Sequence, residues 1–321
     1  MSDKIKLLCI AGATASGKSA LALDCARRYG GEIVSADSMQ IYRGMDIGTA
    51  KPTASERAQI PHHMIDICSV RDAYSLADWI ADAKPIIADI AARGKLPIIC
   101  GGTGLYIDTL IAGVDLSAAA GDETVRAELY ARAEAEGAEA IHRELASVDP
   151  ASAAAIHPNN VRRVIRAIEI YRATGITKTD WDERSREKGS DYEATVYVLE
   201  RPRDELYARI DRRVDEMMKA GLEAEARRFF DDGDLTPDTA AGQAIGYKEF
   251  LPYFRGEATL AEAVDEIKLA TRHYAKRQQT WFKRNKTAVH IDASGGSGLC
   301  PDNPQGDESP LDPKQKTVQK F

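Results

Sequence analysis

The sequence predicts an α/β fold in which a parallel β-sheet is flanked by helices. Residues 4–11 form a short apolar run that ends at Gly12, which is typical of a buried strand. Residues 19–29 have the apolar spacing of a helix, and 32–36 form a second strand-like run. A strand, a helix and a strand in this order favour a parallel sheet with a right-handed crossover.

Further elements of the same kind follow along the chain. Residues 96–100 and 194–200 predict two more strands, and 289–291 predict a strand at the edge of the sheet. Residues 75–92 predict a helix with an interruption at Pro85, because proline lacks a backbone N–H. The remaining helices of this part are expected at 204–220, 222–231 and 260–284.

The middle of the chain predicts a separate helical region. Residues 118–155 are rich in Ala and Glu without a strand signal, and 159–174 predict a longer helix that ends at Gly175. The last stretch contains almost nothing apolar, which is typical of disorder. We therefore expect an α/β core that comprises residues 1–114 and 186–292. A helical insertion is expected at 115–185 and a disordered tail at 293–321.

The composition is that of a globular protein that can bury a core. It is 44% hydrophobic and 29% charged. The apolar runs are far too short to cross a bilayer, and no apolar signal region follows Met1. The five cysteines occur singly, without a pair at metal-ligand spacing. We expect a cytoplasmic monomer that binds no membrane.

The charge distribution leaves a nucleic-acid partner open. The chain has a net charge of −7, whereas proteins that bind nucleic acid need a positive surface. Residues 267–286 nevertheless contain seven Lys or Arg and no acid, and 160–172 contain four Arg against one Glu. Because a local patch can dominate a binding groove, the total charge does not exclude RNA.

A phosphate-binding loop lies between the first predicted strand and helix. It matches the pattern G-x-x-x-x-G-K-[ST] in the context that this pattern requires. Lys18 can neutralise outer phosphate oxygens, and the Ser19 hydroxyl can ligate Mg²⁺. The loop indicates a diphosphate or a triphosphate without specifying ATP, and a chance Gly-rich turn is the alternative. Its phosphate-binding residues are Gly12, Ala13, Thr14, Ala15, Ser16, Gly17, Lys18 and Ser19.

Asp37 is the candidate acid beside this loop. It follows the strand 32–36, and ligands of open α/β sheets bind at the carboxyl ends of the strands. A carboxylate there can ligate a metal or act as a general base, and a helix N-cap or loop acid is the structural alternative. An ATPase would carry an acid at the end of a neighbouring strand, whereas 96–100 run into Gly101-Gly102-Thr103. ATP hydrolysis is therefore disfavoured.

Several blocks in a fixed order resemble the tRNA dimethylallyltransferase family. After the phosphate loop come SADSMQIY at 35–42, MDIGTAKP at 45–52 and IPHHMID at 60–66. The series continues with GGTGLY at 101–106, IHPNN at 156–160, GY at 246–247 and KRQQTWF at 276–282. Such a series is far more specific than a phosphate loop alone. Eukaryotic members often carry a C-terminal zinc finger, which Cys300 alone cannot form, so a bacterial form is expected.

The resemblance implies both a fold and a reaction. It implies a P-loop NTPase-like core that holds dimethylallyl diphosphate instead of ATP, with Asp37 as general base for the N6 amine of an adenosine. Thr103 would help Mg²⁺, Lys18 and either Arg209 or Arg213 to stabilise the departing pyrophosphate. The adenosine would be the one on the 3′ side of the tRNA anticodon, flipped out of its stack.

The implied partner is the anticodon stem-loop of tRNA. Arg162, Arg163 and Arg166 lie at helical spacing, for which a solvated helix face is the alternative. Basic residues alternate with Trp281 in the segment 276–286. This pattern favours basic side chains that contact RNA phosphates and an aromatic ring that stacks on a base; the alternative is that Trp281 belongs to the core. The expected tRNA contacts are Asp37, Ser38, Met39, Gln40, Arg162, Arg163, Val164, Ile165, Arg166, Gln243, Gly246, Tyr247, Lys248, Arg277, Gln278 and Trp281.

Two other functions remain open at this level. A small-molecule P-loop kinase would bind ATP and transfer a phosphoryl group, but it does not explain the basic and aromatic segment near the C-terminus. A non-catalytic module that binds RNA or senses nucleotides would keep its function after Asp37→Asn.

Overall fold

A six-stranded parallel sheet forms the centre of the structure. The computed structural model describes residues 4–114, 116, 123–294 and 300. The strand order is β3-β2-β4-β1-β5-β6, and each adjoining pair is parallel. The predicted strands are confirmed, and β3 is an additional one. The strands are β1 (Ile5–Gly12), β2 (Glu32–Ser35), β3 (His62–His63), β4 (Pro97–Gly101), β5 (Tyr192–Glu200) and β6 (Val289–Asp292).

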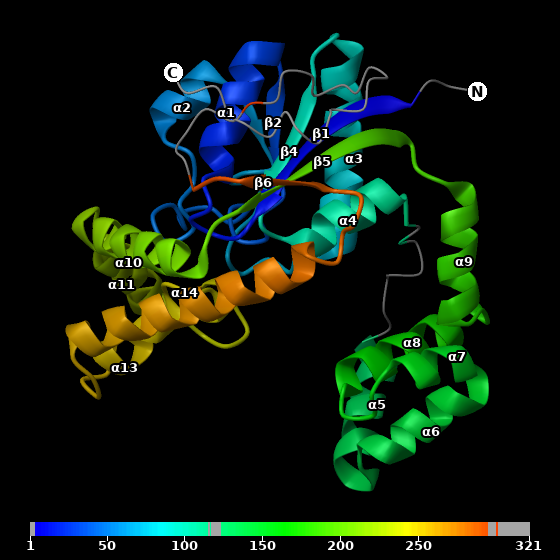
Figure 1. Cartoon of the computed structure of the whole chain (residues 1–321). Coiled ribbons are helices and arrows are strands. Elements are labelled where there is room, and N and C mark those ends of the chain that lie inside the picture. Colours follow the sequence, from blue (N-terminus) through cyan, green and yellow to red (C-terminus); the bar gives the residue numbers. More distant parts are fainter. Residues whose placement is uncertain (1–3, 115, 117–122, 295–299, 301–321) are drawn as a thin grey trace. The chain divides into compact units, whose positions relative to one another are not determined.

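The sheet is covered on both faces. Leu8 and Ile10 of β1 pack against α1 (Lys18–Tyr29), which lies along the sheet in Figure 1. Leu7 and Cys9, which point the other way, are also buried. Burial on both faces is what a parallel sheet requires, and each aliphatic side chain contributes about 1.5–3 kcal/mol to it.

The helices of the α/β part follow the prediction with one correction. α3 (Leu76–Ala92) continues through Pro85, where an interruption was predicted. Ile87 and Ile90 beyond the proline are fully buried, so the packing of this turn outweighs the lost backbone bond. The other helices here are α2 (Ala54–Gln59), α4 (Gly104–Ala112), α10 (Arg203–Lys219), α11 (Leu222–Asp231), α12 (Ala240–Gln243), α13 (Leu251–Phe254) and α14 (Leu260–Phe282).

The chain divides into two compact units. The larger unit comprises residues 1–74, 81–107 and 192–321, and the smaller comprises 75–80 and 108–191. The domain boundaries predicted at 114/115 and 185/186 stay predictions. In the part of the chain that the structure describes, no helix is both long and apolar enough to span a membrane.

The smaller unit is a helical bundle around its own core. Its helices are α5 (Glu123–Glu136), α6 (Ala138–Val148), α7 (Pro150–Ala155), α8 (Val161–Thr174) and α9 (Lys178–Lys188). α8 ends at Gly175, which adopts the left-handed conformation typical of a C-cap. Val164 and Ile165 on α8 are at most 1% exposed and join Leu129 and Leu145 in the core.

The predicted disordered tail needs a partial correction. Ala293 is 2% exposed, and Cys300 packs against the cluster that contains Cys25 of α1. Disorder from residue 293 is therefore wrong for these two positions, because both have an apolar surface to pack on. Residues 295–299 and 301–321 lie outside the described residues.

Candidate active site

The phosphate loop has the backbone shape of an anion cradle. Gly17 has a φ of 104° directly before α1, and Ala15 has a φ of 61°, which is uncommon for a residue with a side chain. A Cβ at Gly12 would lie 2.9 Å from the Leu199 carbonyl oxygen, so only glycine fits between β1 and β5. These conformations curl the loop around the N-terminus of α1, where anions bind.

Side chains from distant parts of the sequence hold this loop. The Arg209 Nε donates to the Ala15 carbonyl at 2.9 Å, and the Arg201 Nε donates to the Ser16 carbonyl at 2.8 Å. The Thr14 N–H donates to the Gln278 side-chain oxygen at 2.8 Å. The loop is therefore fixed from its outer side by α10, α14 and the segment between β5 and α10.

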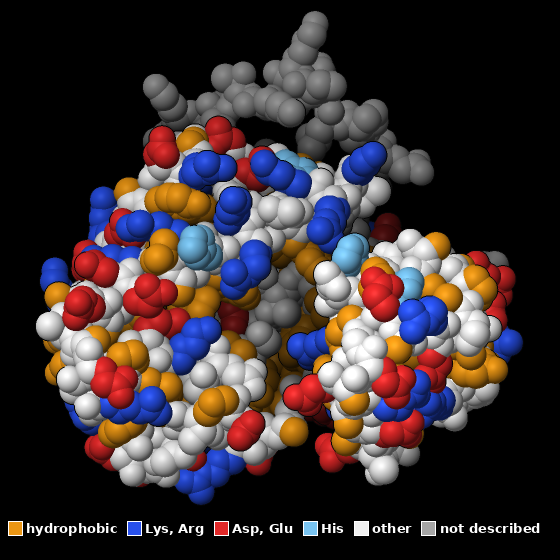
Figure 2. Space-filling model, turned by 90° about the horizontal axis from the view of Figure 1, so that it is seen from below, with side chains coloured by type: hydrophobic (Ala, Val, Ile, Leu, Met, Phe, Trp, Pro, Cys, Tyr) orange, Lys and Arg blue, Asp and Glu red, His pale blue; other side chains and the backbone are white. Residues whose placement is uncertain are grey.

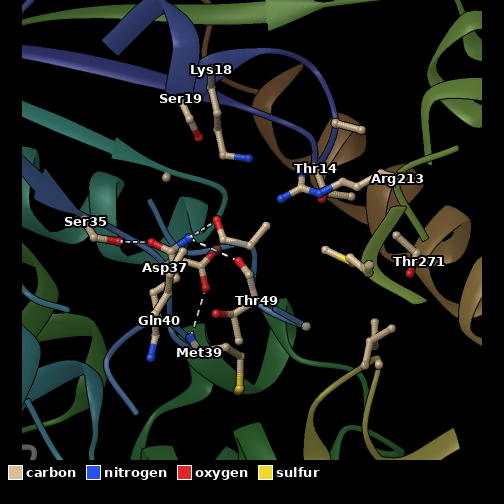
Figure 3. Close-up of a pocket in the computed structure, with 18 of the residues that line it drawn as sticks. Thr14, Lys18, Ser19, Ser35, Asp37, Met39, Gln40, Thr49, Arg213 and Thr271 are labelled. Atoms are coloured by element: carbon tan, nitrogen blue, oxygen red, sulfur yellow. Dashed lines mark hydrogen bonds between the residues drawn. The ribbon is translucent and has the colours of Figure 1, made fainter. Parts of the chain in front are cut away.

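Two cations face the space above the loop. Figure 3 shows Lys18 and Arg213 pointing into the same cavity from α1 and α10. Burial lowers the pKa of Lys18, and the nearby charge of Arg213 lowers it further, while Cys100 and Asp37 act in the opposite direction. The pKa of Arg213 is also lowered by burial, against the effect of Asp37. An anion bound between these cations would offset the free-energy cost of burying their charges.

The geometry distinguishes the two candidate arginines. Both line the cavity, but the Nε of Arg209 is occupied by the Ala15 carbonyl. Arg213 lies near enough to Lys18 and Asp37 for the charges to act on one another. Arg213 is therefore placed to reach a diphosphate, and Arg209 to shape the loop.

Asp37 projects into the cavity from the turn that follows β2. Its Oδ1 accepts from the Met39 N–H at 3.0 Å, and the Ser38 N–H donates to the Thr103 hydroxyl at 3.1 Å. A Cβ at Gly101 would lie 2.0 Å from the Ala36 carbonyl oxygen, so the glycine lets β4 approach this turn. Thr103 thus fixes the Asp37 turn from behind and does not itself line the cavity.

Tyr274 of α14 is a site residue that the sequence did not reveal. Its pKa is raised to about 12, first by burial and then by the negative charge of Asp37. The phenol is also within hydrogen-bonding reach of Thr103 and Gln278. Tyr274 lies one helical turn before Gln278, and this spacing inside the basic segment was the available signal.

The cavity is large and partly apolar. It has a volume of about 750 Å³, within the range of small-molecule sites. The lining includes the phosphate loop and residues 37–40, 48–52, 243–246 and 248. A diphosphate alone would not need an apolar lining, so a ligand with both a phosphate and a hydrocarbon part fits better. The larger apolar lining residues are Leu23, Ile33, Met39, Ile65, Ile210, Val214, Met217, Ile245 and Ile267.

Most of the predicted site residues of the larger unit meet in this cavity. Gly12, Ala13, Ser16, Thr103, Tyr247 and Trp281 belong to the same unit without lining it. Those that line the cavity are Thr14, Ala15, Gly17, Lys18, Ser19, Asp37, Ser38, Met39, Gln40, Arg209, Arg213, Gln243, Gly246, Lys248, Arg277 and Gln278.

Four side chains predicted to touch tRNA are placed otherwise. Tyr247 is fully buried, and Val164 and Ile165 belong to the core of the smaller unit. Gln278 is 5% exposed and bridges Thr14 to the Gly102 carbonyl, to which its Nε2 donates at 2.9 Å. The surfaces of these side chains are used in packing or hydrogen bonds, and the predicted contact of their segments with tRNA stays a prediction.

The exposed basic residues remain candidates for tRNA. Arg162 and Arg163 are exposed on α8, whereas Arg166 is half-buried and pairs with the buried Glu169 at 3.4 Å. Trp281 packs its ring on Gly104, where a Cβ would come within 2.2 Å of it. Lys and Arg side chains gather over the upper part of the larger unit in Figure 2.

The fold and the cavity together define a class of protein. It is an α/β P-loop protein whose cavity combines a phosphate loop, an apolar lining and a carboxylate. A family model described as IPP transferase matches residues 40–285, and one described as isopentenyl transferase matches residues 5–74. The chain therefore belongs to the IPP transferase family.

Individual relatives agree with this assignment. The tRNA dimethylallyltransferase of Geobacillus kaustophilus (strain HTA426) is 49% identical over 289 residues, which cover 90% of each chain. The solved tRNA isopentenylpyrophosphate transferase from Bacillus halodurans is 46% identical, with a TM-score of 0.67 over 90% of each chain. A solved eukaryotic dimethylallyltransferase acting on tRNA is 31% identical, with a TM-score of 0.80 over 91% of this chain and 74% of its own.

Proposed function

We propose that this protein transfers a dimethylallyl group from dimethylallyl diphosphate to N6 of the adenosine on the 3′ side of a tRNA anticodon. The observation that carries the proposal is one cavity that joins a phosphate loop, an apolar lining and Asp37. Names of relatives in the same family point to the same transferred group and to tRNA as its acceptor.

The donor occupies the side of the cavity formed by the phosphate loop. Its diphosphate lies against the N-terminus of α1, with Lys18 and Arg213 neutralising its charge. Its five-carbon chain lies among apolar residues, which disfavour a nucleotide and exclude water from the allylic carbon. This division of the cavity is the main argument against a small-molecule kinase.

The reaction is a displacement at the allylic C1. The lone pair of the adenosine N6 forms the new N–C bond as the C1–O bond breaks, and that bond's electron pair leaves with pyrophosphate. Asp37 accepts the proton that N6 loses. The remaining task of the protein is to place the amine in line with C1 and to stabilise the negative charge on the leaving group.

Mg²⁺ is the proposed cofactor. The Ser19 hydroxyl, exposed at the first turn of α1, fits a single ligand of an ion that otherwise keeps water and phosphate oxygens. No cluster of three His, Cys, Asp or Glu side chains suited to a metal occurs among the described residues. When bound, the ion neutralises the leaving pyrophosphate.

The acceptor is held by positive charge outside the cavity. Lys276 is exposed on α14, Lys283 and Arg284 are exposed directly after its last residue, and Arg162 and Arg163 are exposed on α8. Exposed arginines and lysines contact phosphates and thereby supply most of the affinity for RNA. We place the protein in the cytoplasm, where its tRNA substrate occurs, and we expect it to be a monomer.

The proposal is tested by incubating purified protein with Mg²⁺, radiolabelled dimethylallyl diphosphate and unmodified tRNA. Label should enter the tRNA with the parent protein and not with Asp37→Asn. Digestion of the product to nucleosides should give N6-dimethylallyladenosine. Consumption of ATP without transfer of label would support the kinase instead, and full transfer by Asp37→Asn would remove Asp37 from the mechanism.

A further inference from the structure

The loop that follows the Asp37 turn is bound to a carboxylate from far along the chain. The backbone N–H groups of Asp46, Ile47 and Gly48 all donate to Glu225 of α11, at 3.1, 3.0 and 3.1 Å. Three successive N–H groups that converge in this way form an anion-binding nest. Here the anion is a side chain of the protein itself.

The same carboxylate also binds a third segment. The Tyr247 hydroxyl donates to the Glu225 Oε1 at 2.6 Å. The Tyr247 ring lies against Gly48, where a Cβ would come within 2.5 Å of it. Burial, followed by the charge of Glu225, raises the pKa of Tyr247, so this hydroxyl keeps its proton and remains a donor. Glu225 therefore ties the 46–48 loop to the 243–248 loop.

The contacts continue from this clamp to the Asp37 turn. The Gln40 Nε2 donates to the carbonyls of Thr49 and Ala50 at 3.1 and 3.3 Å. The Ser35 hydroxyl donates to the Gln40 Oε1 at 2.9 Å, as Figure 3 shows. Gln40 thus fixes the turn that carries Asp37 between the end of β2 and the loop that Glu225 holds.

These contacts lie on one side of the cavity. Gly48, Thr49, Ala50 and residues 243–246 line the same cavity as the phosphate-loop residues, and Figure 3 shows Thr49 beside Asp37 and away from Lys18 and Ser19. The phosphate loop is held separately, by Arg201, Arg209 and Gln278. Loss of Glu225 would therefore loosen one wall and leave the diphosphate cradle intact.

We propose that Glu225 is a positioning residue that sets the acceptor side of the cavity, by holding residues 46–50 and Tyr247 so that Asp37 meets the amine of the entering adenosine. Glu225 touches neither substrate. This inference rests on the proposed function, because the effects on donor and acceptor can be measured separately only if the reaction has two substrates.

The test compares Glu225→Gln with Glu223→Gln, a control on the same helix whose carboxylate pairs with Arg227 at 3.5 Å instead of with the loop. Glu225→Gln keeps one acceptor oxygen but puts an N–H donor where the second carboxylate oxygen accepts from the nest. We expect kcat/KM for tRNA to fall by about tenfold or more, since charge-assisted hydrogen bonds are lost. The KM for dimethylallyl diphosphate, and pyrophosphate binding by calorimetry, should stay within about twofold of the parent.

Tyr247→Phe provides a milder second variant. It removes one donor to Glu225 and keeps the ring on Gly48, so it should shift the same tRNA parameter by a smaller factor. Its effect should largely vanish in the Glu225→Gln background, because the two residues act through one contact.

Several outcomes would overturn the proposal. Equal losses of donor and acceptor binding, or a parallel fall in Tm with no selective effect on tRNA, would make Glu225 a general structural residue. Behaviour of Glu225→Gln like that of Glu223→Gln would remove its role altogether. If the parent protein itself transfers no prenyl group to tRNA while still binding pyrophosphate, the proposed function fails instead.

Discussion

The two ends of β2 each carry one acid, and their surroundings differ. Glu32, at the first residue of the strand, is 2% exposed and accepts from Arg93 at 2.8 Å, Lys95 at 2.7 Å and the His63 ring at 2.8 Å. Asp37, just past the last residue, accepts from one backbone N–H and faces Lys18 and Arg213 across a cavity. A charge saturated by protein partners stabilises the fold, whereas charges that face one another across a space await a ligand.

The largest expected effect that separates the two acids is on catalysis. Asp37→Asn should reduce prenyl transfer by about 10²–10⁴-fold, the usual contribution of a general base, with only a small change in Tm. Asp238→Asn, at an exposed position of the same unit, serves as the control. A large fall in Tm for Asp37→Asn would place it with Glu32 as a structural acid.

The cations opposite Asp37 should show the next largest effect. Lys18→Met should lower kcat/KM by about 10²-fold or more and weaken pyrophosphate binding, because the charge on the leaving group loses a partner. Lys219→Met, at the exposed end of α10, should behave like the parent protein. Calorimetric titration with pyrophosphate checks the binding, and retained affinity in Lys18→Met would contradict the assigned anion site.

Glu32 should affect stability and spare catalysis. Glu32→Gln should lower the free energy of unfolding at pH 7 by about 1–3 kcal/mol, a reduced value because its cationic partners are 28–44% exposed. Denaturant unfolding measures the loss, and the exposed Glu257→Gln is the control. A loss of kcat as large as that of Asp37→Asn would erase the contrast between the two ends.

The Glu32 contribution should also depend on pH. The hydrogen bond from Arg93 is the main cause that holds the pKa of Glu32 below its usual value of 4.5. A lowered pKa in the folded state gives a contribution that is complete above the unfolded pKa and is lost as the pH falls below it. The stability difference between parent and Glu32→Gln should therefore shrink progressively below about pH 4.5.

The smallest effect is expected for a charge that faces open solvent, unlike Glu32 and Asp37. Arg163→Ala should weaken tRNA binding several-fold and reduce the slope of affinity against salt by about one unit, while sparing diphosphate binding. Arg143→Ala, exposed on α6 of the same unit, is the control. Equal weakening by both variants would indicate attraction by the unit's overall charge, and loss of diphosphate binding would contradict the role given to α8.

Local patterns were enough to predict the phosphate loop and its surroundings. β1, the loop and α1 are contiguous, so an apolar run, glycines and a helix start define them without knowledge of the rest of the fold. Asp37 was placed correctly because the carboxyl end of a strand follows from the strand itself. Continuity of α3 through Pro85 could not be foreseen, because it depends on burial of the turn beyond the proline.

The roles of single residues within a matched block were harder to predict. A block that resembles the family identifies a segment and not the role of each of its residues. Because of helical periodicity, some of its side chains point into the core, as Val164 does beside the exposed Arg163. Glu225 and Tyr274 escaped notice because their partners lie far away in the sequence, 177 residues in the case of Gly48 and Glu225. Only the folded chain brings such pairs together.

The hydrogen bonds on the outer side of the phosphate loop have a consequence for donor affinity. Because Arg201 and Arg209 donate to the Ser16 and Ala15 carbonyls, the protein's own side chains hold the loop in its anion-binding shape. A protein whose competent conformation is rarely populated loses affinity in proportion to that fraction. Hydrogen bonds from the protein's own arginines raise the competent fraction of the cradle and thereby its affinity for the donor.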